Sequence, residues 1–203
     1  MLILESGLRL FNDAGAAKVS TNRIAAELDI SSGNLYYHFK NKEQIVEWLI
    51  RRFDERLVGI TSASAAVVAL DEMWLVLHLI FEAIQDYRFI YRDVDYLVSA
   101  SPKIAHRVQN ITARQLNSVR EICHSLARAS VILANSDDVD SLVLQITFTT
   151  TCWLTFAKLL PRGGRSQDAG YAAYQALTLL TPYLEPQARS YLTYLRSKYV
   201  EHA

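Results

Sequence analysis

Residues 31–42 carry the densest group of side chains that could bind a nucleic acid, in the order Ser-Ser-Gly-Asn-Leu-Tyr-Tyr-His-Phe-Lys-Asn-Lys. Leu35 and Phe39 are four residues apart, so on a helix both can point inward together. The side chains left pointing outward can hydrogen-bond to phosphates or base edges, and they are Asn34, Tyr36, Tyr37, His38, Lys40 and Lys42. A short helix with such a face fits the major groove of DNA.

The residues before this stretch predict another helix that would position it. Ser20-Thr21 is an N-cap pair, and an apolar stripe follows it as far as Leu28. Asp29-Ile30 predicts a tight break, after which Ser31 or Ser32 can cap the next helix. Two short helices separated in this way form a helix-turn-helix, whose second helix enters the groove.

This pattern resembles the DNA-binding domain of the TetR (tetracycline-repressor) family of bacterial regulators. The resemblance is dense over about the first quarter of the chain, and the rest agrees only in length and helical layout. Tyr87–Pro102 is also similar to one subgroup of TetR-type ligand domains. The residues that carry the main resemblance are Leu10, Phe11, Gly15, Thr21, Ile24, Ala25, Leu28, Ile30, Ser31, Gly33, Leu35, Tyr36, Tyr37, His38, Phe39, Lys42 and Glu43.

The resemblance implies which residues touch DNA. Phosphates would be held by Thr21, Tyr37, His38 and Lys42. Bases would face Ser32, Gly33, Asn34 and Tyr36, and Ser31 completes the predicted DNA-binding set. The carboxamide of Asn34 can pair bidentately with adenine. TetR-type proteins often carry Thr at this position, so no operator sequence is implied.

Composition favours helices and places few charges on the predicted DNA face. The chain of 203 residues is 51% hydrophobic and has only 7 Gly and 4 Pro, which predicts long helices around a large core. Lys+Arg and Asp+Glu are 21 each, so the formal net charge is zero. Residues 18–42 hold four basic and two acidic side chains, a modest excess of two positive charges. Groove contacts and the avidity of a dimer must therefore supply much of the affinity.

We expect an all-α fold of about nine helices, with a three-helix helix-turn-helix head over residues 1–57 and a ligand-binding and dimerisation body over residues 58–203. Asp138–Leu160 is apolar on two sides, so one side needs a second partner. With Asp168–Tyr183 it is the candidate interface of a two-fold homodimer. The other helices predicted after the head cover residues 71–86, 87–99, 102–129 and 186–200, and a helix over residues 41–57 joins head and body.

Aromatic residues in the body are candidates for the wall of an effector pocket. Ligand pockets are mostly apolar with a few polar groups. The candidates are Trp74, His78, Phe81, Phe89 and Trp153. An ordinary aromatic core is the alternative interpretation of the same residues. If they do bind a small apolar effector, the helix over residues 41–57 would carry the resulting change to the head.

The sequence offers little support for catalysis or for a bound metal. Cys123 and His124 are adjacent, and adjacent residues on a helix do not face each other. No two of the five histidines have the four-residue spacing of a helical metal site, and no Gly-rich phosphate loop is present. We therefore predict no enzyme, metal or cofactor. An all-helical enzyme with a non-local site and an adaptor that has lost DNA binding remain alternatives.

Further features favour a cytoplasmic protein without a membrane segment. Cys123 and Cys152 lie far apart in apolar helical patterns, as buried thiols do in a reducing compartment. No signal-peptide pattern opens the chain, and the uncharged run Ser141–Ala157 is rich in Thr. TetR-type proteins usually carry a few basic residues before the first helix, whereas this chain begins almost inside that helix, so the arm is absent or the start lies upstream.

Overall fold

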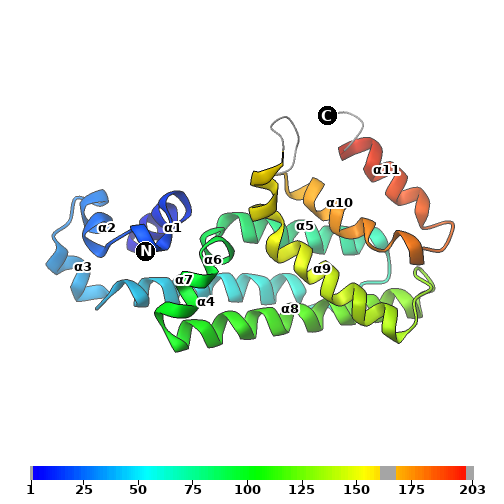
Figure 1. The fold of residues 1–203 in the computed structure, drawn as a ribbon, viewed down its shortest axis with the longest axis horizontal. Helices are drawn as coiled ribbons and strands as arrows, with labels where there is room; N and C mark the ends of the chain where they lie inside the picture. The colour runs from blue at the N-terminus through cyan, green and yellow to red at the C-terminus, as the bar shows by residue number, and fades with distance from the viewer. Residues whose placement is uncertain (1, 161–167, 200–203) are drawn as a thin grey trace. The chain divides into compact units, whose positions relative to one another are not determined.

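The computed structural model describes residues 2–160 and 168–199, and every regular element in these residues is a helix. Eleven α-helices are present there, against about nine expected, which confirms the all-α prediction. They are α1 (Leu2–Ala14), α2 (Thr21–Glu27), α3 (Ser32–His38), α4 (Lys42–Thr61), α5 (Leu70–Asp86), α6 (Phe89–Arg92), α7 (Val94–Ala100), α8 (Pro102–Arg128), α9 (Ser136–Phe156), α10 (Ala169–Thr178) and α11 (Arg189–Tyr199) (Figure 1). The predicted end of the last helix, Val200, lies outside the described residues.

The chain divides into two compact units. Unit 1 comprises Met1–Arg56 and Asp86–Ile111, and unit 2 comprises Leu57–Gln85 and Thr112–Ala203. Helices α4, α5 and α8 each have residues in both units. The division of labour predicted for residues 1–57 and 58–203 remains a prediction, because this grouping rests on packing alone.

Local hydrogen bonds explain why the head forms three short helices. Ser20 Oγ accepts from Arg23 N at 3.2 Å and starts α2, and Ser31 Oγ accepts from Asn34 N at 3.1 Å and starts α3. Between them Asp29 has a positive φ of 52°, which turns the chain sharply. Asn41 Oδ1 accepts from Gln44 N at 2.9 Å at the start of α4. The caps predicted at Ser20 and Ser31 are therefore confirmed, and Asn41 caps α4 in the same way.

Aromatic side chains fill the core of unit 1. Phe11 and Phe53 are fully buried. The ring centroid of Phe11 lies 5.5 Å from that of Phe89, and Phe53 lies 5.5 Å from Tyr87 and 5.8 Å from Tyr91. The segment after α5 thus packs into the same core as α1 and α4, with ring separations that favour attraction.

Several predicted helix boundaries were wrong. Helix α4 continues to Thr61 instead of ending at residue 57, α9 ends at Phe156 instead of Leu160, and α10 ends at Thr178 instead of Tyr183. The single helix expected over residues 87–99 is two helices, because the backbone of Asp93 leaves the helical region with ψ of 26°. The helix predicted to start at Asp71 begins one residue earlier, at Leu70. The Glu72 carboxylate accepts from Val68 N at 2.7 Å and Ala69 N at 3.2 Å.

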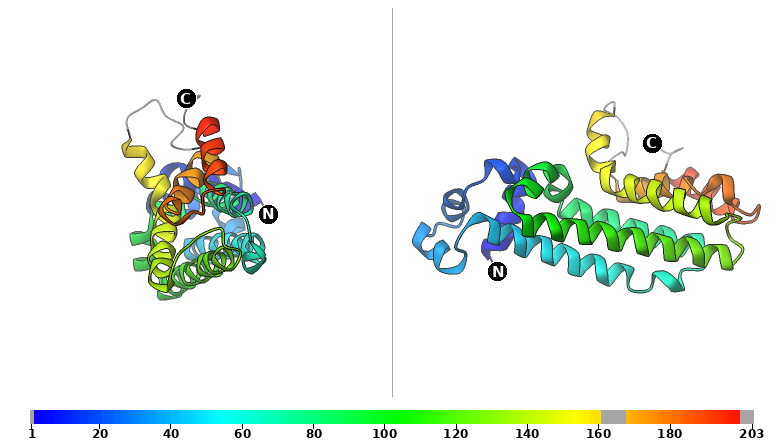
Figure 2. Two further views of the ribbon diagram at one scale, coloured as in Figure 1. Left: turned by 90° about the vertical axis from the view of Figure 1, so that its right-hand side faces the viewer. Right: turned by 60° about the horizontal axis from the view of Figure 1, so that its bottom comes forward.

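Unit 2 is a helical body with one large apolar core. Side chains from α5, α8, α9, α10 and α11 share this core, including Phe81, Cys123 and Ile146. Helix α10 packs against both α9 and α11, which lie on either side of it in Figure 2. A capping box between Asn135 and Asp138 begins α9.

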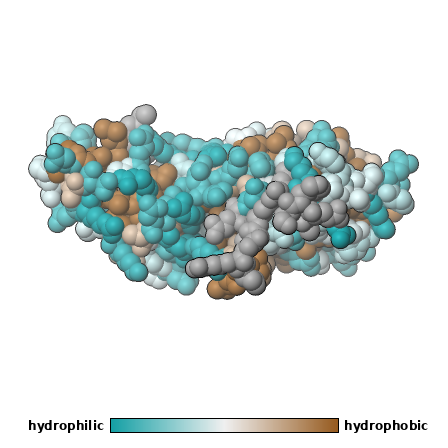
Figure 3. All heavy atoms as spheres, turned by 90° about the horizontal axis from the view of Figure 1, so that it is seen from above, coloured by the Kyte–Doolittle hydropathy of each residue, from teal (hydrophilic) through white to brown (hydrophobic). Residues whose placement is uncertain are grey.

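Helix α9 has a buried side and an exposed side. Val139, Leu142, Val143 and Ile146 are buried in unit 2. Ser136–Leu159 is long and apolar enough to cross a membrane by length and composition, a test that core helices of soluble proteins also pass. On the face drawn in Figure 3, hydrophobic residues form separate patches among hydrophilic ones. We interpret α9 as a core helix with one exposed apolar strip.

The buried thiol of Cys123 should make stability depend on alkaline pH. Burial raises its pKa from the ordinary value of 9.0 to about 11. Because this folded-state pKa is raised, the stability contributed by the neutral thiol is complete below pH 9 and is lost as pH rises through 11. The expected loss in unfolding free energy is about 2–3 kcal/mol. Chemical denaturation should show that the unfolding free energy falls less between pH 8 and 11 in Cys123→Ala than in the wild type, by this amount. Parallel pH dependences of the two proteins would contradict the assignment.

Candidate nucleic-acid interface

Helix α3 exposes nearly all of its side chains. Leu35 is fully buried and anchors the helix, whereas every other residue of α3 is exposed. Tyr37 is 85% exposed and stands edge-on to His38, with ring centroids 5.1 Å apart. A helix held by one apolar anchor, with an aromatic and polar outer face, can enter a major groove without disturbing its own packing.

Some of the residues predicted to contact DNA also form hydrogen bonds between α2 and α3. Thr21 Oγ1 and Tyr36 OH are 3.0 Å apart, and Ser32 Oγ donates to Asn22 Oδ1 at 3.0 Å. A Cβ added to Gly33 would meet only Ser31 Oγ, at 3.8 Å. The chain itself therefore leaves the space above Gly33 open, which suits the predicted close approach of its backbone to a ligand.

Lysines line a hollow beside the start of α2, which we call the lysine hollow. It measures about 350 Å³ and is lined by Ala17, Lys18, Val19, Ser20, Thr21, Tyr36, Lys40, Asn41 and Lys42. Three ammonium groups with hydroxyl and amide donors are the chemistry that binds a phosphate. Lys42 Nζ donates to Ala16 O at 2.9 Å and lies 4.9 Å from the centre of the Tyr96 ring. Lys42 is thus anchored at the edge of the hollow where the resemblance places a phosphate.

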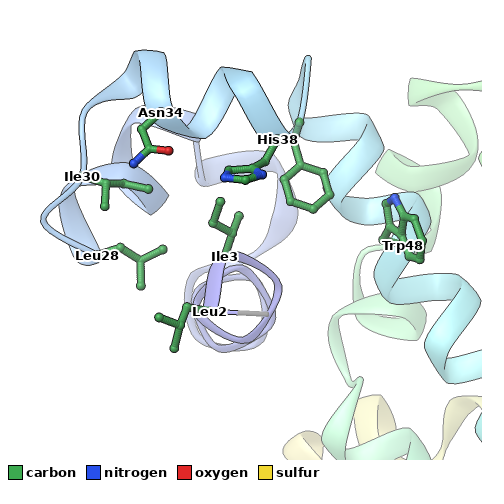
Figure 4. A pocket seen from close by; sticks show the side chains of 8 residues that line it. Leu2, Ile3, Leu28, Ile30, Asn34, His38 and Trp48 are labelled. Atoms are coloured by element: carbon green, nitrogen blue, oxygen red, sulfur yellow. The ribbon is translucent and has the colours of Figure 1, made fainter.

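A second hollow lies on the other side of α3, and we call it the apolar hollow. It measures about 660 Å³ and is lined by Leu2, Ile3, Leu28, Ile30, Asn34, His38, Phe39 and Trp48 (Figure 4). Asn34, His38 and the indole of Trp48 carry its polar side-chain groups, so Asn34, the predicted base contact, has mostly apolar neighbours. Sequence reasoning missed this hollow because part of its wall, Leu2 and Ile3, comes from α1, about thirty residues before α3.

The predicted effector residues do not line a common cavity among the hollows described here. Trp74 stacks on His78 with centroids 4.9 Å apart, and His78 Nε2 lies 3.4 Å from Glu82 Oε1. Phe81 is buried in the core of unit 2, and Trp153 packs near Phe156 and Tyr171. Phe89 belongs to unit 1, where it packs on Phe11. Their role in effector binding remains a prediction.

Unit 2 contains a small enclosed hollow of about 10 Å³, which we call the core hollow. Its wall includes two buried polar side chains, Gln115 and Thr150. The other lining residues are Thr61, Met73, Val76, Leu77, Ile80, Ser118, Val119 and Ile122. No ionisable side chain lines this hollow. In the described residues, no group of three His, Cys, Asp or Glu could hold a metal ion.

These features define a helix-turn-helix DNA-binding protein. Residues 3–49 match the family described as bacterial regulatory proteins, tetR family, and residues 52–192 match TetR, described as bacterial transcriptional repressor. The chain therefore belongs to the TetR family and is a transcriptional regulator, which confirms the resemblance drawn from the sequence.

Individual relatives support this assignment to different extents. A TetR-family transcriptional regulator from Marinobacter aquaeolei VT8 is 34% identical over 97% of this chain and 96% of that one, with a TM-score of 0.89. An HTH-type transcriptional regulator of Staphylococcus aureus (strain USA300) is 44% identical over 50 residues, which are 25% of this chain and 27% of the relative. A transcriptional regulator from Saccharomonospora viridis, solved in complex with choline, aligns with 90% of this chain over 96% of its own chain, with a TM-score of 0.69. Because the two sequences are only 17% identical, this likeness shows the fold alone. The chain thus matches about a quarter of the length of its curated relatives.

Proposed function

We propose that this chain is a cytoplasmic repressor that binds a palindromic DNA operator as a homodimer and is released by a small apolar effector. The observation that carries the proposal is α3, a capped helix that buries only Leu35 and exposes its other residues beside the lysine hollow. The family match to residues 52–192, described as bacterial transcriptional repressor, supports the direction of regulation.

Nuclease footprinting on the DNA upstream of the chain's own gene tests this proposal. The expected footprint covers two half-sites related by a dyad, with centres about one helical turn, roughly 34 Å, apart. A symmetric pair is expected because one short helix reads too few bases to give specific binding alone. A single asymmetric protected site would contradict the dimeric repressor, and no protection at any protein concentration would contradict DNA binding altogether.

The exposed strip of α9 supports the proposed homodimer. Leu144 is 64% exposed, Phe148 is 69% exposed and Leu159, just beyond the helix, is 79% exposed. The four-residue spacing of Leu144 and Phe148 puts these two on one side of α9. Every residue of α10 is at least half-buried, and α11 packs against it, so α10 offers less free surface than the sequence suggested. We therefore place the proposed interface chiefly on α9.

The core hollow is our candidate for the effector site. It is closed in this structure, and at about 10 Å³ it holds about one water-sized probe, so an effector would have to widen it. Its wall carries hydroxyl and carboxamide groups but no charged side chain, which favours a neutral, mainly apolar molecule with one hydrogen-bonding group. The wall predicted from Trp74, His78, Phe81, Phe89 and Trp153 remains an alternative location for this site.

Release of DNA requires that the effector bind one conformation better than another. Helix α4 begins four residues after α3 and continues from unit 1 into unit 2. A widened core hollow touches this helix at Thr61. A tilt of α4 in both protomers would change the spacing of the two heads, and coupling of about 1–3 kcal/mol would weaken DNA binding by about 5- to 150-fold.

Gln115→Leu should weaken the response to the effector and leave operator binding intact. The variant removes the carboxamide from the core hollow, and one lost hydrogen bond should raise the concentration of a neutral apolar effector needed for release by about tenfold. The measurement is release of labelled operator in a screen of neutral, cationic and anionic compounds. Gln109→Leu on the exposed side of α8 is the matched control. An unchanged response in Gln115→Leu, or release by charged compounds only, would place the effector site elsewhere.

A further inference from the structure

The C-terminal end of α1 receives its positive charge from a distant part of the chain. No basic residue lies in the last turn of α1, where carbonyl groups and the helix dipole favour a cation. The guanidinium of Arg92 fills this role, because it donates to Phe11 O and to Asn12 O, each at 2.6 Å. These two contacts join residues about eighty positions apart within unit 1.

Asp93 links that cap to the segment that follows α1. Its carboxylate accepts from Arg92 Nε at 2.9 Å and from a terminal guanidinium nitrogen at 3.0 Å. It also accepts from Ala16 N at 2.8 Å, directly after Gly15, whose φ is +94°. The Arg92 and Asp93 side chains are 23% and 16% exposed, so water screens this pair less than a surface pair. The hydrogen bond to Asp93 raises the pKa of Arg92 above its ordinary value.

The segment held in this way also anchors the lysine hollow. Ala16 donates its N–H to Asp93 and accepts from Lys42 Nζ through its carbonyl oxygen. Ala17 and Lys18, the next residues, are part of the hollow's wall. Asp93 therefore contacts the residue next to the wall of the candidate phosphate site, and Arg92 holds Asp93, although neither lines the hollow.

We propose that Arg92 and Asp93 are positioning residues for DNA binding, which fix the Phe11–Lys18 segment so that Lys18 and Lys42 are presented to a phosphate. The proposal rests on the proposed function and extends it to residues outside the helix-turn-helix. It assigns the α6–α7 junction an indirect role in setting the affinity of the head for DNA. The junction acts through hydrogen bonds to the backbone of the head and makes no contact with DNA itself.

Arg92→Gln tests this role in the full-length chain. We expect operator affinity, measured by fluorescence anisotropy of labelled upstream DNA, to fall by about tenfold. We also expect the slope of log affinity against log salt to fall by about one unit, because one phosphate contact is lost. Arg88→Gln is the matched control, since it removes an exposed ion pair between the same two segments, with Arg88 2.9 Å from Asp13. Its affinity should change less than twofold, at an unchanged salt slope.

A double-mutant cycle separates positioning from general stabilisation. In a Lys42→Gln background, Arg92→Gln should cost less than twofold, because the contact that it positions is already absent. Should Arg92→Gln unfold, Asp93→Asn and Arg92→Lys take its place in both measurements, since each keeps part of the network. An unchanged salt slope in the folded variants, or independent effects of Arg92 and Lys42, would overturn the proposal. A wild-type chain that binds no DNA would instead refute the proposed function.

Discussion

Phe148→Asp is expected to convert the dimer into a monomer and to weaken operator binding by about 10²- to 10⁴-fold. The Phe148 side chain is 69% exposed near the middle of the apolar strip of α9, so in the proposed interface it would be buried against a second copy. A carboxylate there would lose its hydration without gaining a partner. The loss in DNA affinity is large because two linked heads bind with an avidity that one head lacks.

Light scattering at micromolar concentration and anisotropy with operator DNA measure the two effects. Leu133→Asp is the control, because Leu133 is 68% exposed in the loop before α9 and lies outside the proposed interface. It should remain dimeric and bind DNA normally. A Phe148→Asp protein that is still dimeric, or a monomer with wild-type DNA affinity, would contradict the proposed arrangement.

Leu35→Ala should abolish high-affinity DNA binding while unit 2 stays folded. Leu35 is the only buried residue of α3, and truncating such an anchor costs about 2–5 kcal/mol. Seven residues do not form a stable helix by themselves in water. If the cost falls on the docking of α3, operator affinity should drop by at least about 30-fold. Hydrogen exchange should show lost protection in α3 and unchanged protection in the core of unit 2.

Asn34→Ala is the matched variant for Leu35→Ala because it alters an exposed neighbour on the same helix. It should leave the melting temperature unchanged and relax the preference for one base pair, at a cost of about 1–3 kcal/mol at that position. Binding-site selection with both variants distinguishes a lost helix from a lost base contact. Wild-type operator affinity in Leu35→Ala would show that α3 does not carry recognition.

Local signals in the sequence predicted the head well. The caps Ser20, Ser31 and Asn41 act within three residues of their own position, so their partners could be identified from spacing alone. The buried position of Leu35 also followed from spacing. These features depend on short-range geometry, which the order of residues determines directly.

Features that depend on long-range contacts could not be predicted in the same way. The contacts of Arg92 could not be predicted, because nothing near it in sequence indicates the carbonyls of Phe11 and Asn12. The predicted effector wall assumed that aromatic residues converge. In the structure Trp74 pairs with His78 one turn away, and Phe89 packs in unit 1. The core hollow was missed because it forms where small and branched side chains leave space between helices.

Binding of the full-length chain to the DNA upstream of its own gene tests the central claim most directly. Fluorescence anisotropy at about 0.15 M salt should show binding that is at least about 10³-fold tighter to this DNA than to a shuffled duplex of equal length. Affinity should fall steeply with added salt, as phosphate contacts require. Equal affinity for both duplexes, or no binding to either, would contradict a sequence-specific regulator and would favour an adaptor that has lost recognition of DNA.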